Sequence, residues 1–545
     1  MTQDIQDFIH SAPNDLKIVR IGDPLYQYAR VISNTRFGHM PAMIAYCKTA
    51  SHVQACLHFC YRYEFKFRIR SGGHQHEGMS SGDGVLIIDL SKMDTIEYID
   101  DTHAWIPVGK QLGKVYDELE ERGQIIPGGG CQSVNVGGLT QGGGWGLSIR
   151  KYGMTCDSVL ECEIVLADGT VAYPSPTHLP DLFWALKGGG GGNFGVVTRF
   201  RFKLPSLGEV TTSFSLLWKD GKDAVKAMKI WTVLHADLTG LNTGLSTACG
   251  MMVASPKNDK GEEIDLPEGH VSAVHARMGG LFYGSKKTLL SILRKYFGDL
   301  IPKEEKHFVS LKETKHKQLY KNALDSSNQS NTLSLAKHQN IISEFVNPTV
   351  HINDTSSTAT SCKEDRNYRV LPNAPSSTCD RPHPHKVTSG FPKATTDHCE
   401  LVDTIYEYLG HTCFYIDVNR YMSFHCLGGA VTEHTAQRVF AFPTKPYLLQ
   451  IQCWWDDAGN AFTNVARNKV YVQWVEDFRK NLASQIEGAF INFIDRSLVP
   501  NPETPEGRLQ LLEIYYQENL EKLRGIKTKY DPENIFDFGM SIPLI

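Results

Sequence analysis

Two glycine-rich stretches decide how this chain folds: Arg70-Ser71-Gly72-Gly73-His74 and Gly128-Gly129-Gly130-Cys131-Gln132-Ser133-Val134-Asn135-Val136-Gly137-Gly138. The first follows the strand-like run 65–69. Glycines let a backbone pass close to a flat ring and turn N–H groups towards a pyrophosphate. The imidazole of His74 and the thiolate of Cys131 are nucleophiles that can add to an electrophilic ring system. The pattern therefore predicts a flavin cradle in which both side chains can attach the cofactor covalently.

Glycine is distributed unevenly along the rest of the chain. Nine of the twenty residues 127–146 are glycine, as are six of the eight residues 188–195. This density is more than packing requires and favours a cofactor site that uses both segments.

Length and composition set limits on the class of protein. A chain of 545 residues exceeds what one core usually holds, so we expect two or three domains. The hydrophobic fraction of 41% and the charged fraction of 21% are typical of a globular protein. A net charge of -4, without a dense Lys/Arg stripe, argues against nucleic acid as a partner.

Other features of the sequence concern its location. The first residues are acidic and polar, unlike a signal peptide, and no run approaches the ~18 apolar residues of a membrane helix. Thirteen cysteines without regular spacing indicate a reducing compartment rather than a disulfide framework. We therefore expect a cytoplasmic protein that does not associate with a membrane. The sequence leaves its oligomeric state open.

Residues 1–204 alternate between helix-like and strand-like runs. Hydrophobic spacing predicts helices over 50–62 and 115–122, strands over 65–70 and 85–90, and a hairpin that starts with 159–167 and turns at Asp168-Gly169.

Beyond Leu204-Pro205 the runs become longer. We predict a sheet with helices from these strand-like and helical runs, for example 213–218, 273–283, 286–297 and 447–455. A polar segment at about 312–392 is predicted to be an insertion with long loops. An amphipathic helix over 509–530, ended by Asp531-Pro532, is expected to return to the first domain.

Several motifs occur in an order that resembles the berberine-bridge-enzyme-like flavoprotein oxidases, within the wider vanillyl-alcohol-oxidase fold. The resemblance runs from about Pro24 to the C-terminus. Its motifs are Arg70-Ser71-Gly72-Gly73-His74, Gly130-Cys131, Val136-Gly137-Gly138, Gly142-Gly143-Gly144-Trp145-Gly146, Arg150-Lys151-Tyr152-Gly153, Gly189-Gly190-Gly191-Gly192-Asn193-Phe194-Gly195 and Tyr530-Asp531-Pro532-Glu533-Asn534-Ile535-Phe536.

The resemblance implies an α+β protein. A PCMH-type (vanillyl-alcohol-oxidase-like) FAD-binding domain would comprise residues 1–204 and 496–545, and a substrate domain of sheet and helices would comprise residues 205–495. In the family, the residue matching His74 carries the 8α bond to the flavin and the residue matching Cys131 the 6-S bond. Val134 matches a position that governs oxygen access. The cofactor-binding residues that the resemblance implies are His74, Cys131, Arg70, Ser71, Gly72, Gly73, Val134, Gly137, Gly138, Gly143, Gly144, Trp145, Gly146, Gly192, Asn193, Gly195, Val197 and Asn519.

Some positions depart from the family pattern. Leu139 stands where many relatives have histidine, and Trp145 where they often have tyrosine. Phe490 and Phe493 replace the tyrosines of a strand that supplies the base in members acting on alcohols and sugars, and neither phenylalanine can take a proton. Gln450 replaces the glutamate of the founding enzyme type, so the usual bases are absent.

The base must then come from elsewhere. The candidates are Asp417, Tyr421 and His425, on the run 415–425 expected to cover the flavin, although polar residues on a strand often only face solvent.

Two other groups of residues suggest metal binding only weakly. Cys56 and Cys60 share one helix face while His58 points away from it, so we interpret them as core and surface. Cys362, Cys379, His383 and His385 match no zinc spacing that we recognise.

These observations predict a two-domain oxidase with a bicovalently bound FAD. It would transfer a hydride from a bulky small molecule, a natural-product intermediate, to flavin N5, and O2 would reoxidise the flavin to give hydrogen peroxide. One alternative is a sugar or oligosaccharide oxidase with a relocated base. Another is a flavin-carrying binding protein without turnover.

Overall fold

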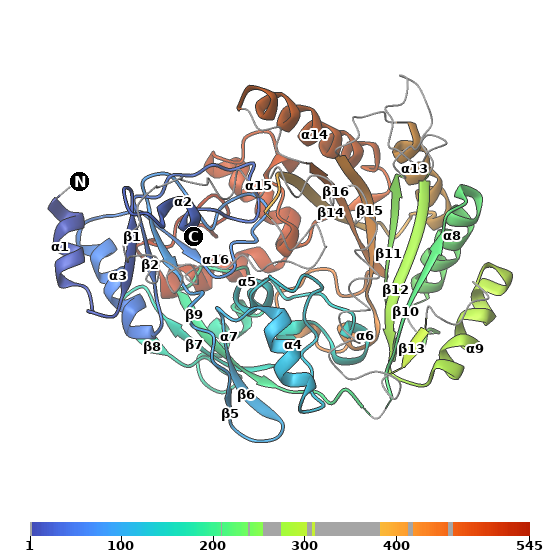
Figure 1. The fold of residues 1–545 in the computed structure, drawn as a ribbon, viewed down its shortest axis with the longest axis horizontal. Coiled ribbons are helices and arrows are strands. Elements are labelled where there is room, and N and C mark those ends of the chain that lie inside the picture. The colour runs from blue at the N-terminus through green and yellow to red at the C-terminus, as the bar shows by residue number, and fades with distance from the viewer. Residues whose placement is uncertain are drawn as a thin grey trace, which may run out of the picture.

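The computed structural model describes residues 3–208, 210–237, 240–253, 274–301, 308–310, 382–411, 418–455 and 461–545. Three β-sheets with helices packed against them make up these residues (Figure 1), which confirms the α+β class predicted from the sequence. Two sheets use strands that lie before residue 204, and the third uses strands from residue 212 to residue 487. The division into a FAD-binding and a substrate domain stays a prediction.

The first sheet has four strands in the order β1-β2-β4-β3. Strands β2 and β3 run parallel to β4, and β1 is antiparallel to β2. The helix predicted over 50–62 is observed as α3, and Thr49 caps it by accepting a hydrogen bond from the His52 amide. The bounds are α1 Gln3–Ser11, β1 Lys17–Arg20, α2 Tyr26–Ala29, β2 Met43–Tyr46, α3 Ala50–Arg62, β3 Phe67–Arg70 and β4 Leu86–Asp89.

Helix α3 carries the first of the two residue groups that were considered for metal binding. Cys56 and Cys60 are buried in the core, whereas His58 is exposed. No cluster of His, Cys, Asp or Glu among the described residues could hold a metal ion. The burial of Cys56 and Cys60 and the exposure of His58 agree with their interpretation as core and surface.

The second sheet has five antiparallel strands in the order β5-β6-β9-β7-β8. The hairpin predicted around Asp168-Gly169 is observed between β7 and β8. The bounds are β5 Glu97–Tyr98, β6 His103–Pro107, α4 Leu112–Glu120, α5 Val136–Gln141, α6 Ile149–Tyr152, β7 Val159–Val165, β8 Val171–Ala172, α7 Pro180–Ala185 and β9 Val196–Lys203.

The third sheet has eight antiparallel strands in the order β13-β10-β12-β11-β15-β16-β14-β17. Helices α8, α9, α13 and α14 lie on its outer side, away from the two smaller sheets (Figure 1). The bounds are β10 Thr212–Trp218, α8 Gly221–Ala236, β11 Leu245–Val253, β12 Val274–Phe282, α9 Lys286–Phe297, β13 Phe308–Ser310, β14 His385–Pro392, α13 His398–His411, β15 Val418–Cys426, β16 Tyr447–Trp455, α14 Ala461–Asn481 and β17 Ile486–Glu487.

Strand β14 corrects the predicted insertion. Residues 385–392 were expected in polar loops, but they form a strand that is buried throughout and pairs with β16 and β17. Its polar side chains find partners inside the protein; Lys386, for example, bonds to Glu77 and Asp495. The polar composition of this segment led to the prediction of loops, although its residues form a buried strand. Cys362 and Cys379 lie outside the described residues.

The C-terminal segment corrects a second prediction. Instead of one helix over 509–530, the structure has α15, Pro505–Tyr516, and α16, Asn519–Tyr530. The break lies at Gln517, whose φ of 49° is incompatible with a continuous right-handed helix. Helix α16 packs against α7, so the segment does return to the first part of the chain, as predicted.

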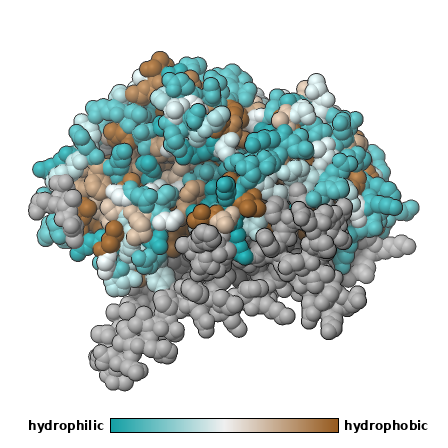
Figure 2. Space-filling model, turned by 90° about the horizontal axis from the view of Figure 1, so that it is seen from above, coloured by the Kyte–Doolittle hydropathy of each residue, from teal (hydrophilic) through white to brown (hydrophobic). Residues whose placement is uncertain are grey.

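The described residues contain no helix that is both long and apolar enough to cross a membrane. On the face drawn in Figure 2, hydrophilic side chains predominate and the apolar ones lie scattered among them. Isolated surface apolar residues of this kind are normal in globular proteins.

Candidate active site

A cavity of about 390 Å³ lies between the glycine-rich segments and the eight-stranded sheet, a volume in the range of small-molecule and cofactor sites. One side, the glycine wall, consists of residues 71–74, 129–131, 137–139 and 190–193. Another side, the sheet wall, carries side chains of four neighbouring strands. These residues are Gly250, Met252, Arg277, Tyr421, Ser423, His425, Gln450, Gln452 and Trp454.

The glycine wall combines close backbone packing with open space. A Cβ on Gly137 would lie 2.9 Å from Cβ of Val108, so only glycine fits there without a shift. Ser71 fixes the same contact by donating a hydrogen bond of 2.6 Å to the Val108 carbonyl. A Cβ on Gly138, by contrast, would meet no atom within 4 Å. Gly138 therefore presents bare backbone to the cavity.

The two predicted attachment residues both line this cavity. The Oγ of Ser133 lies 3.0 Å from Nε2 of His74. Val134, the predicted oxygen-access residue, also lines the cavity.

Most of the other predicted cofactor residues line the cavity too: Ser71, Gly72, Gly73, Gly137, Gly138, Trp145, Gly192, Asn193, Gly195 and Val197.

Five predicted cofactor residues do not line it, and each contacts protein instead. Arg70 is fully buried and forms a 2.5 Å ion pair with Asp89. The Asn519 side chain donates to the Val439 carbonyl at 2.8 Å. The remaining three are held close to other parts of the chain, namely Gly143 at Met154, Gly144 at Thr155 and Gly146 at the Gly128 carbonyl.

The sheet wall follows from strand alternation. In β15, Met422 and Phe424 point into the core under the helices, which leaves Tyr421, Ser423 and His425 on the cavity side. Paired residues of β16 complete a row of polar side chains. The Tyr421 hydroxyl donates to Oε1 of Gln452 at 3.0 Å.

His425 is held from two sides. Its Nε2 lies 2.9 Å from Oε1 of Gln450, and its ring packs edge-on against Trp145 at 4.4 Å. Burial lowers the pKa of His425 to about 4, against the opposing effect of the Gln450 hydrogen bond. The ring is therefore neutral at neutral pH. Two of the three predicted base candidates, Tyr421 and His425, thus lie at the cavity, and Asp417 lies outside the described residues.

The segment 490–495 was expected to be a strand, and this is wrong. Residues Ile491–Phe493 form a 3₁₀ turn. Phe490 and Phe493 both line the cavity, and Asn492 between them donates to the Leu139 carbonyl at 3.1 Å. Phe490 and Phe493 therefore offer only apolar rings to the site.

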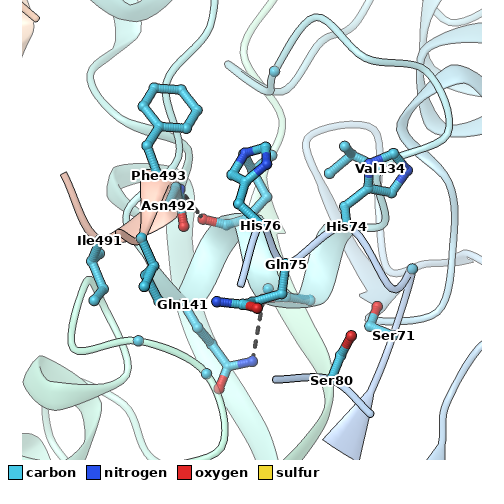
Figure 3. A pocket seen from close by; sticks show the side chains of 18 of the residues that line it. Ser71, His74, Gln75, His76, Ser80, Val134, Gln141, Ile491, Asn492 and Phe493 are labelled. Atoms are coloured by element: carbon cyan, nitrogen blue, oxygen red, sulfur yellow. Dashed lines mark hydrogen bonds between the residues drawn. The ribbon is translucent and has the colours of Figure 1, made fainter. Parts of the chain in front are cut away.

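Sequence reasoning missed His76. Figure 3 shows His74 and His76 projecting to the same side of their loop, with Gln75 pointing to the other. The signal was present in the His-x-His spacing, because alternate residues of an extended segment share a face. Gln75, Gln141 and Tyr516 also line the cavity and were not predicted.

The cavity fits a large, polar, partly flat ligand such as FAD. The Gln75 side-chain nitrogen lines it and has no hydrogen-bond partner among the described residues. Unpaired donors of this kind are rare in proteins unless a ligand or water satisfies them. Together with the bare backbone at Gly138, this donor supplies what a phosphate or a heterocyclic oxygen requires.

Comparisons with known proteins also indicate a protein that binds FAD. A family model described as FAD binding domain matches residues 41–173, and one described as Berberine and berberine like matches residues 489–543. The FAD-linked oxidoreductase YgaK of Bacillus subtilis is 28% identical over 534 residues, which are 97% of this chain and 96% of that protein. Tetrahydroberberine oxidase of Berberis wilsoniae is 25% identical over 517 residues, 90% of this chain and 83% of that protein. A solved structure of chitooligosaccharide oxidase shares the fold, with a TM-score of 0.73, 21% identity and full coverage of both chains.

Proposed function

Because the chain belongs to the berberine-bridge-enzyme-like FAD-linked oxidoreductases, we propose that it is an oxidase with a bicovalently attached flavin. In this proposal, a bulky small molecule is oxidised against the sheet wall. When bound, FAD accepts a hydride and passes two electrons to O2, which yields hydrogen peroxide.

The residues that would hold the cofactor are those of the glycine wall. His74 would carry the 8α bond and Cys131 the 6-S bond. Gly138 and Gln75 would contact polar atoms of the cofactor. The observation that carries the proposal is that His74, Cys131 and the open Gly138 line one and the same cavity.

The sheet wall supports a natural-product substrate as the first choice. It places Tyr421 and Trp454 beside the amides of Gln450 and Gln452, and no carboxylate among the described residues of this wall takes part. Aromatic and amide groups suit a large heterocyclic or phenolic molecule better than a cation. The tetrahydroberberine oxidase relative acts, by its name, on a molecule of this class.

A sugar oxidase is the second candidate. The linked polar groups of Tyr421, Gln452 and Ser423 could pair with several hydroxyls, since the Gln452 amide also donates to Ser423 at 3.1 Å. The structural relative chitooligosaccharide oxidase is named for such a substrate. A flavin-carrying protein without turnover is the third.

Two measurements test the proposal. After reconstitution of the purified protein with FAD, acid precipitation should leave the flavin in the pellet, with mass adducts on the peptides of His74 and Cys131. The variant Cys131→Ala should keep a singly attached flavin with a changed spectrum, and Cys399→Ala serves as a control thiol. Free FAD in the supernatant and unmodified peptides would refute attachment.

Peroxide release then separates the candidate functions. Tetrahydroberberine, cinnamyl alcohol and N,N'-diacetylchitobiose represent an amine, an allylic alcohol and a sugar. Release with the first two only supports the first choice, and release with the sugar only supports the second. Flavin attachment without peroxide from any of the panel, under a range of pH, would favour the binding protein.

A further inference from the structure

A chain of two imidazoles ends at the cavity. Nδ1 of His76 lies 2.9 Å from Nε2 of His385, and Nδ1 of His385 lies 2.9 Å from the His383 carbonyl oxygen. A carbonyl oxygen can only accept, so Nδ1 of His385 carries the hydrogen. In a neutral ring its Nε2 is then the acceptor, and His76 must donate through Nδ1. The remaining nitrogen of His76, Nε2, is therefore unprotonated.

This assignment requires both rings to be neutral, and their surroundings favour that state. Burial, with smaller contributions from His74 and Lys386, lowers the pKa of His76 to about 3. Burial also lowers the pKa of His385, and the neighbouring His76 acts in the same direction.

The charged side chains near the two imidazoles form ion pairs with one another. Lys386 pairs with Glu77 at 2.8 Å and with Asp495 at 2.5 Å, and Arg36 pairs with the same Glu77 at 3.2 Å. Each carboxylate is thus already engaged by a cation, and within the described residues neither hydrogen-bonds to an imidazole of the pair. No described carboxylate therefore holds a proton on His76.

The position of the pair is fixed by the backbone. The Asn34 amide donates to the carbonyls of His76 at 2.6 Å and of His385 at 3.0 Å, and its oxygen accepts from the His385 amide at 3.1 Å. The His385 ring also stacks on Trp454 of the sheet wall at 4.0 Å. Asn34 is fully buried, so this clamp is shielded from water.

The unprotonated Nε2 belongs to a residue of the cavity wall, and the same cavity also holds the base candidates Tyr421 and His425. His76 lines the cavity, and no described residue hydrogen-bonds this nitrogen. Its ring centre lies 6.0 Å from that of Phe493, and His425 on the sheet wall lies 5.9 Å from the same ring. His76 therefore sits beside the substrate-facing wall as well as two residues after His74.

We infer that His76 is the proton acceptor of the oxidation, a catalytic residue, and that His385 is the positioning residue that directs its Nε2 towards the substrate. The inference rests on the proposed function. It identifies the substrate class as a molecule that loses an O–H proton: an alcohol, a hemiacetal or a phenol.

For an alcohol, the chemistry balances as follows. The O–H bond breaks and its proton passes to Nε2 of His76, while the C–H hydrogen leaves with its electron pair and a C=O bond forms. The substrate thereby loses two electrons and two hydrogens, one as a hydride to the bound flavin and one as a proton to the imidazole. Release of that proton to solvent restores neutral His76.

The protonation state can be tested without any turnover. Diethyl pyrocarbonate acylates an unprotonated imidazole nitrogen, and peptide mass analysis reports the rate at each histidine. In the holoenzyme, labelling of His76 should stay nearly constant from pH 7.5 to 5.5, while added N-acetylhistidine, with a pKa near 6.5, loses close to tenfold in rate per pH unit below that value. His385, with both nitrogens engaged, should remain unlabelled. Unlabelled His76, or a pH response like that of N-acetylhistidine, would overturn the inference.

The variants test the catalytic role. His76→Gln should lower the rate constant for oxidation of cinnamyl alcohol or N,N'-diacetylchitobiose, whichever the wild type accepts, by about 10²–10⁴-fold while flavin content is retained. The exposed His58→Gln is the matched control. His385→Phe keeps the stack on Trp454 but removes the acceptor, so kcat should fall with little change in KM, and His385→Gln should recover part of it.

The results that would refute the role of His76 differ from the results that would refute the proposed function. If the wild type oxidises none of the panel, the proposed function fails, and the labelling of His76 decides the state of this nitrogen by itself. If the wild type is active and His76→Gln keeps its rate, the assigned role is wrong and the oxidase assignment stands.

Discussion

The glycine wall and the sheet wall border one cavity, but the chain builds them by opposite means. The glycine wall comes from short contiguous motifs whose local geometry needs glycine, as at Gly137 against Val108. The sheet wall collects single side chains from β11, β12, β15 and β16, which long-range strand pairing brings together. The first can be recognised in the sequence because its function resides in the backbone. The second depends on which face of each strand turns to the cavity, and its chemistry can therefore change without disturbing the cofactor.

A large effect that separates the two walls is expected at Gly138. The variant Gly138→Val places a branched side chain in the open space of the cavity, so flavin content should fall at least about tenfold, a loss of roughly 1.4 kcal/mol or more in binding. Gly38→Val is a matched control, because a Cβ there also meets no atom within 4 Å but Gly38 is exposed outside the cavity. Flavin absorbance per protein measures the effect. Equal flavin content in the two variants would contradict the assignment of the glycine wall to the cofactor.

A second prediction concerns the ion pairs that link β14 to the loop after the glycine wall and to the segment after the 3₁₀ turn. Lys386 at the start of β14 bonds to Glu77, which follows His76, and to Asp495 near the 3₁₀ turn. Burial raises the pKa of Asp495, but attraction to Lys386 outweighs it and the net shift is downward. Asp495→Asn leaves a buried cation under-compensated, so it should cost about 3–5 kcal/mol of unfolding free energy.

The melting temperature at neutral pH is the measurement for Asp495→Asn. Asp477→Asn removes an exposed partner of Lys480 and should cost no more than about 1 kcal/mol. Adding Lys386→Met to Asp495→Asn should restore part of the loss, because the unpaired charge is gone. A melting temperature of Asp495→Asn equal to that of Asp477→Asn would mean that this network does not stabilise the fold around β14.

The difference between local motifs and long-range strand pairing also explains which elements could be predicted from the sequence. Helix α3 lies where hydrophobic spacing placed it, since it buries one continuous face, and α9 and β16 coincide with the predicted runs 286–297 and 447–455. Strand β14 was mistaken for loop because its polar side chains are satisfied by residues distant in sequence, such as Glu77 and Asp495. No pattern in the local sequence predicts partners that lie so far away along the chain.

The candidate site shows the same limit. The sequence identified His74, Cys131 and most of the glycines as cavity residues, and it also pointed to Tyr421 and His425. It missed His76, whose significance depends on His385, more than 300 residues away in the chain. A histidine takes its role from the partner on its other nitrogen, and that partner is known only once the sheet has formed.

A third prediction uses the low pKa of His425, about 4. In the unfolded chain the group has an ordinary pKa near 6.5, so between pH 6.5 and 4 the unfolded state binds a proton that the native state does not. The difference in proton binding has no effect above pH 6.5. As the pH falls from 6.5 to about 4, it lowers the free energy of unfolding by at most about 1.4 kcal/mol per pH unit. His425→Phe should therefore reduce the acid sensitivity of the melting temperature, measured between pH 7.5 and 4.5. An unchanged pH dependence would show that His425 is protonated in the native protein.

The smallest expected effect is at Tyr421, on the sheet wall. Tyr421→Phe removes the hydroxyl that donates to Gln452 and keeps the ring, so a substrate bound beside it should lose about 0.5–1.5 kcal/mol, or roughly 2- to 12-fold in kcat/KM. Flavin attachment should be unchanged, because the sheet wall makes no part of the predicted covalent site. Leu217→Ala, an exposed residue of the same sheet, is the control for general effects on the sheet. If Tyr421→Phe lowered flavin content and left kcat/KM intact, the roles of the two walls would have to be exchanged, because the cofactor ring would then lie against Tyr421 and the substrate against the glycines.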